Sequence, residues 1–244
     1  MSRDVWSAVD RYFEERLAAT DPVLEDVLRA CDQAGLPPHA VSPMQGRLLA
    51  LLAGLLGARR ILEIGTLGGY SAIWLARALP ADGRLVTLES DPAHARVARA
   101  NFVRAGVEDR VELLEGEALA SLPKLADAEG PPFDLVFIDA DKARNLDYFR
   151  WALALADVGS AIVVDNVVRG GEVVDGDSRD PGVLGVRRLA DWLASQSASE
   201  VTVLQTVGVK GYDGLLIARV VEADPARPAA ASPPTAPTPE EPGA

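Results

Sequence analysis

The chain has 244 residues, of which 48% are hydrophobic and 25% are charged, and its formal net charge is -12 at pH 7. A chain of this length and composition can bury the core of one large domain. The negative charge disfavours binding to RNA or DNA, and the longest apolar stretch, Leu48–Leu56, is too short to span a membrane.

The first 57 residues are expected to form three helices. Apolar residues recur at helical spacing over Asp4–Ala19, which predicts an amphipathic helix. A second helix is expected to begin after the capping pair Asp21-Pro22 and to end near Gly35, and a third to span Pro43–Gly57. Because acidic residues interrupt the apolar ones near the N-terminus, this region does not resemble a signal peptide.

Cysteine content bears on the cellular compartment. Cys31 is the single cysteine, so the chain cannot form an internal disulfide. Cys31 lies in the second expected helix, where we expect it to be a packing residue. A chain without a disulfide or a signal peptide fits the reducing cytoplasm, so we expect a soluble cytoplasmic protein.

From residue 58 onward, short apolar runs alternate with helical segments. The expected strands are Arg60–Ile64, Leu85–Leu88, Arg110–Leu114, Phe133–Ile138, Ser160–Val164, Val201–Val207 and Gly214–Val221. The expected helices are Tyr70–Leu79, Asp91–Ala105, Glu117–Leu125, Lys142–Ala156 and Gly182–Gln196. This alternation predicts an α/β fold, with a mostly parallel seven-stranded sheet and helices on both faces. The last two strands have no helix between them, so we expect one antiparallel strand.

These elements predict one domain over residues 1–221, with N-terminal helices at about 4–57 and an α/β core at about 58–221. The remaining residues, 222–244, differ in composition, because seven prolines lie between Pro225 and Pro242. A segment rich in proline and alanine cannot bury a core, so we expect a disordered tail.

Ligands of such sheets bind beyond the carboxyl ends of the strands, and the first two strands end in informative residues. The first is followed by the glycine-rich turn Glu63–Ser71, which allows close approach to a ligand but lacks the dinucleotide spacing G-x-G-x-x-G. The second is followed by Glu89, whose carboxylate suits two ribose hydroxyls. Together they predict a nucleoside ligand, although Glu89 could also be a solvated carboxylate.

Oxygen-bearing side chains follow the fourth and fifth strands. Asp139, Asp141 and Lys142 come after the fourth, and Asp165 and Asn166 after the fifth. If these strands are neighbours, Asp139, Asp165 and Asn166 converge as all-oxygen ligands of a hard cation such as magnesium, with manganese or calcium as alternatives. Asp and Asn also commonly cap loops, so this pattern alone leaves the alternative open. Neither histidine of the chain is expected to be a ligand.

Three motifs resemble one known family. They are Glu63-Ile-Gly-Thr-Leu-Gly-Gly-Tyr-Ser71, Phe133-Asp-Leu-Val-Phe-Ile-Asp-Ala-Asp-Lys142 and Val163-Val-Asp-Asn166. In these motifs the chain resembles the cation-dependent class I O-methyltransferases, the group of catechol O-methyltransferase and caffeoyl-CoA O-methyltransferase, and its bacterial branch in particular. The resemblance covers roughly residues 41–219 and implies the Rossmann-like class I methyltransferase fold.

The resemblance also implies roles for individual residues. The methyl donor S-adenosylmethionine would lie against Val41, Glu63, Gly65, Thr66, Ser71, Glu89, Ala118 and Asp141. Asp139, Asp165 and Asn166 would hold the divalent cation, and Lys142 would be the general base. The acceptor would be a small aromatic vicinal diol, and the protein would be a homodimer.

The acidity of phenols is consistent with these roles. A phenol with a pKa of about 10 is mostly protonated at neutral pH, so a cation that stabilises the phenolate and a base that takes the proton would both assist transfer. Lys142 could instead be the ion-pair partner of Asp139 or Asp141.

The chain departs from the family at the acceptor side. Relatives often carry tryptophan where this chain has Arg169, and a loop rich in glycine and aspartate follows at Gly170–Pro181. The identity of the acceptor therefore stays open. Three other functions also stay open: a metal-independent small-molecule methyltransferase, a non-catalytic donor-binding module, and a nicotinamide-dependent oxidoreductase, which the glycine spacing disfavours.

Overall fold

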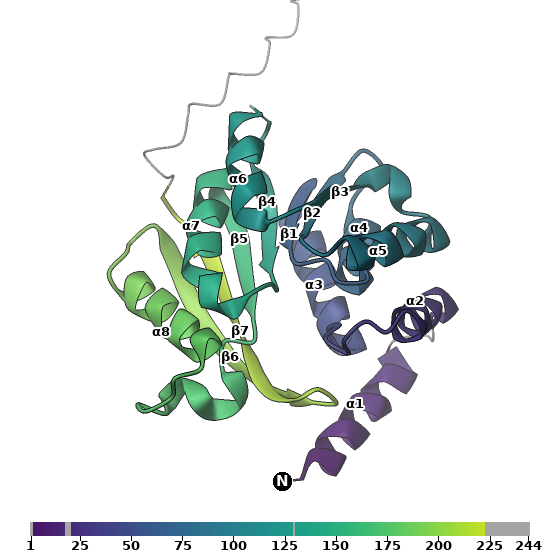
Figure 1. Ribbon diagram of the computed structural model, residues 1–244, viewed down its shortest axis with the longest axis horizontal. Coiled ribbons are helices and arrows are strands. Elements are labelled where there is room, and N and C mark those ends of the chain that lie inside the picture. The colour runs from purple at the N-terminus through teal and green to yellow at the C-terminus, as the bar shows by residue number, and fades with distance from the viewer. Residues whose placement is uncertain (1, 18–20, 129, 223–244) are drawn as a thin grey trace, which may run out of the picture.

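A seven-stranded sheet forms the centre of the computed structural model, which describes residues 2–17, 21–128 and 130–222 (Figure 1). The strands are β1 (Arg60–Ile64), β2 (Arg84–Glu89), β3 (Val111–Glu115), β4 (Phe133–Ile138), β5 (Ala156–Asp165), β6 (Ser199–Gly208) and β7 (Gly211–Val220). Their order is β3-β2-β1-β4-β5-β7-β6, and β7 runs antiparallel to both of its neighbours. The predicted Rossmann-like sheet with one reversed strand is therefore confirmed. The predicted tail, 222–244, lies outside the described residues except for residue 222.

Helices cover both faces of this sheet. They are α1 (Arg3–Leu17), α2 (Pro22–Gln33), α3 (Pro43–Leu56), α4 (Tyr70–Ala78), α5 (Pro92–Ala105), α6 (Ala118–Asp127), α7 (Asn145–Leu155) and α8 (Pro181–Ala194). Short 3-10 helices are η1 (Glu108–Arg110), η2 (Lys142–Arg144) and η3 (Arg169–Val174). One apolar cluster, around Ile73 and Phe137, packs helices α2, α3, α4 and α5 against one face of the sheet. A second cluster, around Ile138 and Phe149, packs helices α6, α7 and α8 against the other face.

Four helices begin at a side-chain cap followed by proline. The pairs are Asp21-Pro22, Ser42-Pro43, Asp91-Pro92 and Asp180-Pro181, and each capping oxygen accepts a hydrogen bond from a backbone N–H of the first turn. Proline fits the first helical position because its missing N–H has no intrahelical partner there. These local signals explain why the starts of α2 and α3 could be predicted closely.

Several predicted boundaries were wrong, among them the start of the fifth strand, which is Ala156 rather than Ser160. The helix expected over Lys142–Ala156 starts as η2, because Asp141 accepts the N–H of Ala143 and closes a tight turn before α7 begins. Residue 156 belongs instead to β5. The last strand starts at Gly211 rather than Gly214, because the β6–β7 ladder continues to a Gly208–Gly211 pair and Gly211 adopts the left-handed φ of +101°.

The N-terminal helix lies beside the tip of the β6–β7 hairpin (Figure 1). Asp10 of α1 accepts a hydrogen bond of 2.7 Å from the backbone N–H of Val209 in that tip. None of the α1 residues is buried. None of the helices in the described ranges has both the length and the apolar character needed to cross a membrane.

Candidate active site

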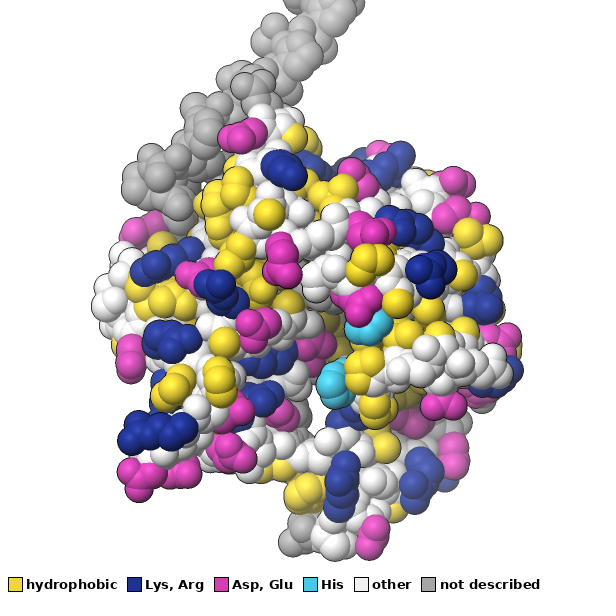
Figure 2. Space-filling view, in the orientation of Figure 1, with side chains coloured by type: hydrophobic (Ala, Val, Ile, Leu, Met, Phe, Trp, Pro, Cys, Tyr) yellow, Lys and Arg dark blue, Asp and Glu magenta, His cyan; other side chains and the backbone are white. Residues whose placement is uncertain are grey.

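A cleft of about 1760 Å³ opens at the carboxyl ends of the parallel strands. The turns that follow β1 to β5 line it, together with α1, the start of α3 and the β6–β7 hairpin. Figure 2 shows the molecular surface hollowed near its centre, with both basic and acidic side chains around the hollow. All of the predicted site residues except Glu63 line this cleft. The topology therefore brings together side chains that lie far apart in the sequence.

The turn after β1 approaches the end of β4 closely. Gly65 has a φ of +101°, and a Cβ atom there would overlap the carbonyl oxygen of Asp139. Only glycine tolerates both this left-handed φ and this close approach, so Gly65 allows the ends of β1 and β4 to lie in contact. The same turn presents Thr66 to the cleft and leads into α4, which begins after Gly69, also in the left-handed region.

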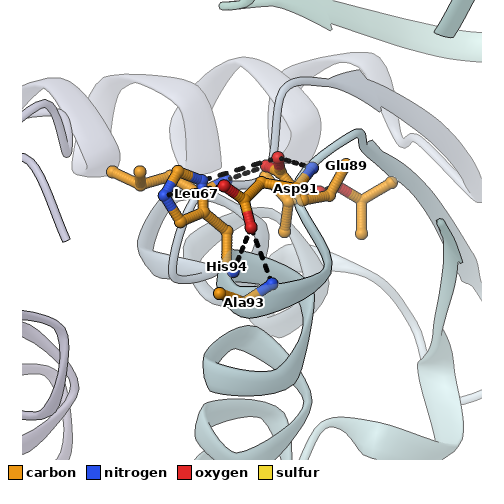
Figure 3. Close-up of polar contacts among 7 residues, drawn as sticks. Leu67, Glu89, Asp91, Ala93 and His94 are labelled. Carbon is orange, nitrogen blue, oxygen red and sulfur yellow. Dashed lines mark hydrogen bonds and ion pairs between the residues drawn. The ribbon is translucent and has the colours of Figure 1, made fainter. Parts of the chain in front are cut away.

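Glu89 is fixed in position at the end of β2 (Figure 3). Its two oxygens accept backbone N–H groups of Leu67, at 2.7 Å, and of Asp91, at 2.9 Å. His94 lies 3.6 Å from the same carboxylate. Glu89 therefore ties the β1–α4 turn to the start of α5 while still lining the cleft.

Glu63 lies beneath the floor of the cleft and is fully buried. Its Oε2 accepts a 2.5 Å hydrogen bond from the hydroxyl of Thr87, which lies 2.5 Å from the hydroxyl of Thr66. Its Oε1 has no hydrogen-bond partner among the described residues. Burial raises the pKa of Glu63 to about 8, and the nearby hydroxyls of Ser71 and Thr87 lower it only in part. Glu63 is therefore mostly protonated at neutral pH in this ligand-free chain.

Lys142 forms an ion pair with Asp139 across the turn that follows β4. The distance from its Nζ to Asp139 Oδ1 is 2.5 Å, and both side chains are mostly buried. Asp141 is exposed and caps η2, although it also lines the cleft. Val41, before α3, and Ala118, at the first position of α6, form further parts of the wall.

Asp165 ends β5, the strand next to β4. Its carboxylate accepts a 2.7 Å hydrogen bond from the side-chain amide of Gln45 and another of 2.7 Å from the backbone N–H of Asn166. Burial raises the pKa of Asp165 to about 7, and the negative charge of Asp139 raises it further. The two carboxylates therefore lie close enough to repel each other.

This arrangement fits a hard cation in its chemistry. A positive ion between Asp139 and Asp165 would remove the repulsion that raises the pKa of Asp165, and the Asn166 amide would add a third oxygen. Within residues 2–17, 21–128 and 130–222, no group of three or more His, Cys, Asp or Glu side chains is arranged to hold a metal ion. The predicted set contains only two such side chains, with an amide as its third member.

Several cleft residues were not predicted. Lys210, in the β6–β7 hairpin, donates a 2.6 Å hydrogen bond to the carbonyl of Pro38, and burial lowers its pKa while the charges of Asp139 and Asp165 oppose that effect. Gln45 comes from the first turn of α3. No sequence pattern marks either residue, because each reaches the cleft through the packing of a distant element.

Backbone strain is concentrated around the same cleft. In the described residues, the non-glycine residues with positive φ are Leu67 at 51°, Asn166 at 57° and Arg169 at 58°, and all of them line it. Left-handed backbone is costly for residues with a Cβ, and such strain often marks functional sites.

Comparisons with known proteins agree with this geometry. A family model described as O-methyltransferase matches residues 14–221. The chain is 47% identical to the catechol O-methyltransferase of Niastella koreensis over 90% of this chain and 100% of that protein. It is 52% identical to the catechol O-methyltransferase of Mycobacterium tuberculosis over 87% of this chain and 94% of that protein.

Solved structures similar to this chain are also O-methyltransferases. The O-methyltransferase of Bacillus cereus, solved in complex with SAH, is 52% identical and superimposes with a TM-score of 0.88 over 90% of this chain and all of that one. The O-methyltransferase TomG of Streptomyces achromogenes, solved in complex with SAM, is 50% identical, with a TM-score of 0.88 over 91% of this chain and all of that one. The chain therefore belongs to the O-methyltransferase family and is an O-methyltransferase.

Proposed function

We propose that this enzyme transfers a methyl group from S-adenosylmethionine to one hydroxyl of an aromatic vicinal diol held on a divalent cation. The observation that carries the proposal is the pair of close carboxylates, Asp139 and Asp165, at the ends of adjacent strands, with Lys142 bonded to one of them. The two catechol O-methyltransferases to which the chain is similar support an aromatic diol as the acceptor.

The donor site would lie on the β1–β2 side of the cleft. Bound S-adenosylmethionine supplies an electrophilic methyl group on a sulfonium. Gly65 and Thr66 would approach it through the backbone, and Glu89, already oriented by two backbone N–H groups, would accept the ribose hydroxyls. Ala118 would lie near the adenine. The relatives solved with SAH and SAM support this ligand.

Glu63 would act on the donor from beneath the cleft, because it does not line the cleft itself. Its hydrogen bond with Thr87 continues to Thr66, so the three side chains form a buried chain that ends at the donor turn. This chain would hold the turn in the conformation that admits the ligand.

The cation site would lie on the β4–β5 side. Asp139, Asp165 and Asn166 offer only oxygen atoms, which favours magnesium, with manganese or calcium as alternatives. A bound cation supplies positive charge that stabilises a phenolate. A cation held by Asp139 would compete with the ammonium of Lys142 for that carboxylate and would favour the neutral amine, whose Nζ lone pair could take the hydroxyl proton.

A metal-independent methyltransferase is the second candidate, and one observation favours it. Both carboxylates already have partners within the chain: Lys142 on Asp139 and the amide of Gln45 on Asp165. In that case Lys142 would be a structural ion-pair partner, and the acceptor would be oriented without a cation.

Methyl transfer to catechol, caffeic acid and quercetin, with magnesium and with EDTA, separates the two candidates. We expect magnesium-dependent methylation of at least one diol, and a loss of about 100-fold or more in Asp165→Asn. Asp109→Asn, an exposed acid on η1, is the matched control and should keep full activity. Activity that survives EDTA would establish the metal-independent enzyme. Donor binding without transfer to any of these diols would leave the donor site standing and point to a different acceptor.

A further inference from the structure

Basic as well as acidic side chains line the cleft, although the chain as a whole carries a net charge of -12. Arg3, Arg169 and Lys210 are among these basic residues. The acids nearby are already occupied. Asp10 accepts the N–H of Val209, and Asp213 accepts three backbone N–H groups of the segments around it. These neutral N–H groups leave the charge of both acids in place, but among the described residues neither acid forms an ion pair with Arg3, Arg169 or Lys210.

Arg169 is the least satisfied of these cations. Its Nε is buried and has no hydrogen-bond partner among the described residues. Its guanidinium lies 3.9 Å from Asp180, at the far limit of an ion pair, and its side chain is 31% exposed. A buried guanidinium N–H without a partner is costly, and the exposed part of the same side chain can still donate hydrogen bonds to a ligand.

Arg169 also lies close to the proposed base. A Cβ atom built at Gly182 would lie 3.2 Å from Lys142 Cβ and 3.5 Å from Arg169 Nε, so the two side chains flank the same glycine. The left-handed backbone of Arg169 is held by Asp213, whose Oδ1 accepts its N–H at 2.9 Å. The fold therefore maintains a strained conformation at the residue whose guanidinium faces the cleft.

Lys210 adds a second charge from another element. Its Nζ donates to the carbonyl of Pro38, which leaves two of the three ammonium donors for other groups, and the charges of Asp139 and Asp165 act on it. With a divalent cation between those two carboxylates, their charge is balanced. Lys210 and Arg169 then supply positive charge that the cation site does not need.

We propose that the acceptor is an aromatic diol that also carries a carboxylate, and that Arg169 and Lys210 bind this carboxylate. The inference rests on the proposed function, because it assigns the diol to the carboxylate pair and the anionic group to Arg169 and Lys210. The planar fork of an arginine matches a carboxylate with two parallel hydrogen bonds, and a lysine adds a point charge. Arg169 and Lys210 are thus specificity-determining residues for the acceptor.

The test compares 3,4-dihydroxybenzoate with its methyl ester, which keeps the diol and lacks the charge. Affinities are measured by calorimetry in the presence of S-adenosylhomocysteine and magnesium, and kcat/KM is measured in parallel. We expect the acid to bind about 10-fold more tightly than the ester. Arg169→Gln and Lys210→Gln should each reduce that ratio several-fold, and Arg169→Lys should restore part of it. Arg179→Gln, an exposed arginine in the same loop, should keep the ratio.

The outcomes separate this inference from the proposed function. Equal affinities for acid and ester, or a ratio unchanged in both Arg169→Gln and Lys210→Gln, would overturn it. Equal methylation of the two compounds would leave diol methylation standing. Selective, Arg169-dependent binding of the acid without methyl transfer would support the basic site and contradict the proposed reaction. Lys210→Gln keeps the test decisive if Arg169→Gln, at a strained position, does not fold.

Discussion

Glu63 is a carboxyl group that the fold holds in a fully buried position at the end of β1. Its pKa is raised from 4.5 to about 8, chiefly by burial. A carboxyl group with a raised pKa in the folded state contributes stability that is fully present below its unfolded pKa and is lost as the pH rises through the folded value. The free energy of unfolding should therefore fall between about pH 5 and pH 8.

Replacing Glu63 with glutamine tests this dependence, because glutamine stays neutral across the range. We expect the wild-type protein to lose more stability between pH 5.5 and pH 8 than Glu63→Gln does, as measured by urea unfolding. Asp165, whose pKa is also raised, is present in both proteins and contributes equally. Glu108→Gln, an exposed acid, should follow the wild type. Parallel curves for Glu63→Gln and wild type would show that Glu63 is ionised in the folded protein.

Lys142 contacts Asp139, one of the predicted cation ligands, so its loss should affect catalysis more than donor binding. We expect Lys142→Ala to lower kcat by about 100-fold, the usual size of a general-base effect, with a much smaller change in the Kd for S-adenosylmethionine. Lys124→Ala, an exposed lysine on α6, serves as the control. Unchanged turnover in Lys142→Ala would remove Lys142 from the catalytic residues.

Some site residues could be predicted from sequence, and others could not. Asp139 and Asp165 each follow a buried apolar strand, so their meeting at one edge of a parallel sheet follows from the fold class. Lys210 and Gln45 enter the cleft from a hairpin tip and a helix start, and nothing in their local sequence indicates where those elements pack. The depth of Glu63 also depends on packing around β1.

At the scale of elements, Asp213 joins the segment that follows β5 to its own strand, β7. Its Oδ1 accepts the backbone N–H groups of Val168, Arg169 and Gly214, at 2.9 to 3.0 Å. The segment between β5 and η3, which carries the left-handed Arg169, is thereby fixed to β7. Loss of this acceptor leaves partly buried N–H groups without a partner.

Asp213→Ala should therefore lower the free energy of unfolding by about 2 kcal/mol or more, since hydrogen bonds to a charged group contribute roughly 1.5–3 kcal/mol. The KM for the acceptor should rise while the Kd for S-adenosylmethionine changes little, because Asp213 does not contact the glycine turn. Asp213→Asn keeps an acceptor oxygen, so its free energy of unfolding, measured by chemical denaturation, should lie between those of the wild type and Asp213→Ala. If Asp213→Ala has the same stability and the same KM as the wild type, the segment between β5 and η3 is held by its other contacts.

The sequence predicts where the strands lie along the chain, but it does not predict the order of the strands in the sheet. The bounds of β1 and β4 match the apolar runs of the sequence, because both strands are buried and end where polar residues begin. The crossover that places β1 beside β4 depends on contacts between distant residues, which periodicity does not show. The η2 turn was missed for a local reason, since the Asp141 cap competes with the helical pattern that follows it.

At the scale of the whole molecule, one sheet edge is open and apolar. Strand β6 forms that edge, and its residues Val201, Val203 and Leu204 are 39%, 50% and 47% exposed. Tyr12 and Phe13 of the neighbouring helix α1 are also exposed. A long edge strand with apolar side chains is prone to pair with another chain, and monomeric proteins usually protect such edges with charge.

We propose that a second copy of the chain covers β6 and α1 in a homodimer. Light scattering after gel filtration should then give twice the mass of the chain, and Val203→Asp should shift the protein toward the monomer by placing a charge in the interface. Val103→Asp changes a valine that is 63% exposed on α5, away from this edge, and should leave the dimer intact. A wild-type monomer at micromolar concentration would contradict the proposal, and equal dissociation in both variants would place the interface elsewhere. Because α1 also lines the cleft, dissociation of the dimer should be accompanied by a higher KM for the acceptor.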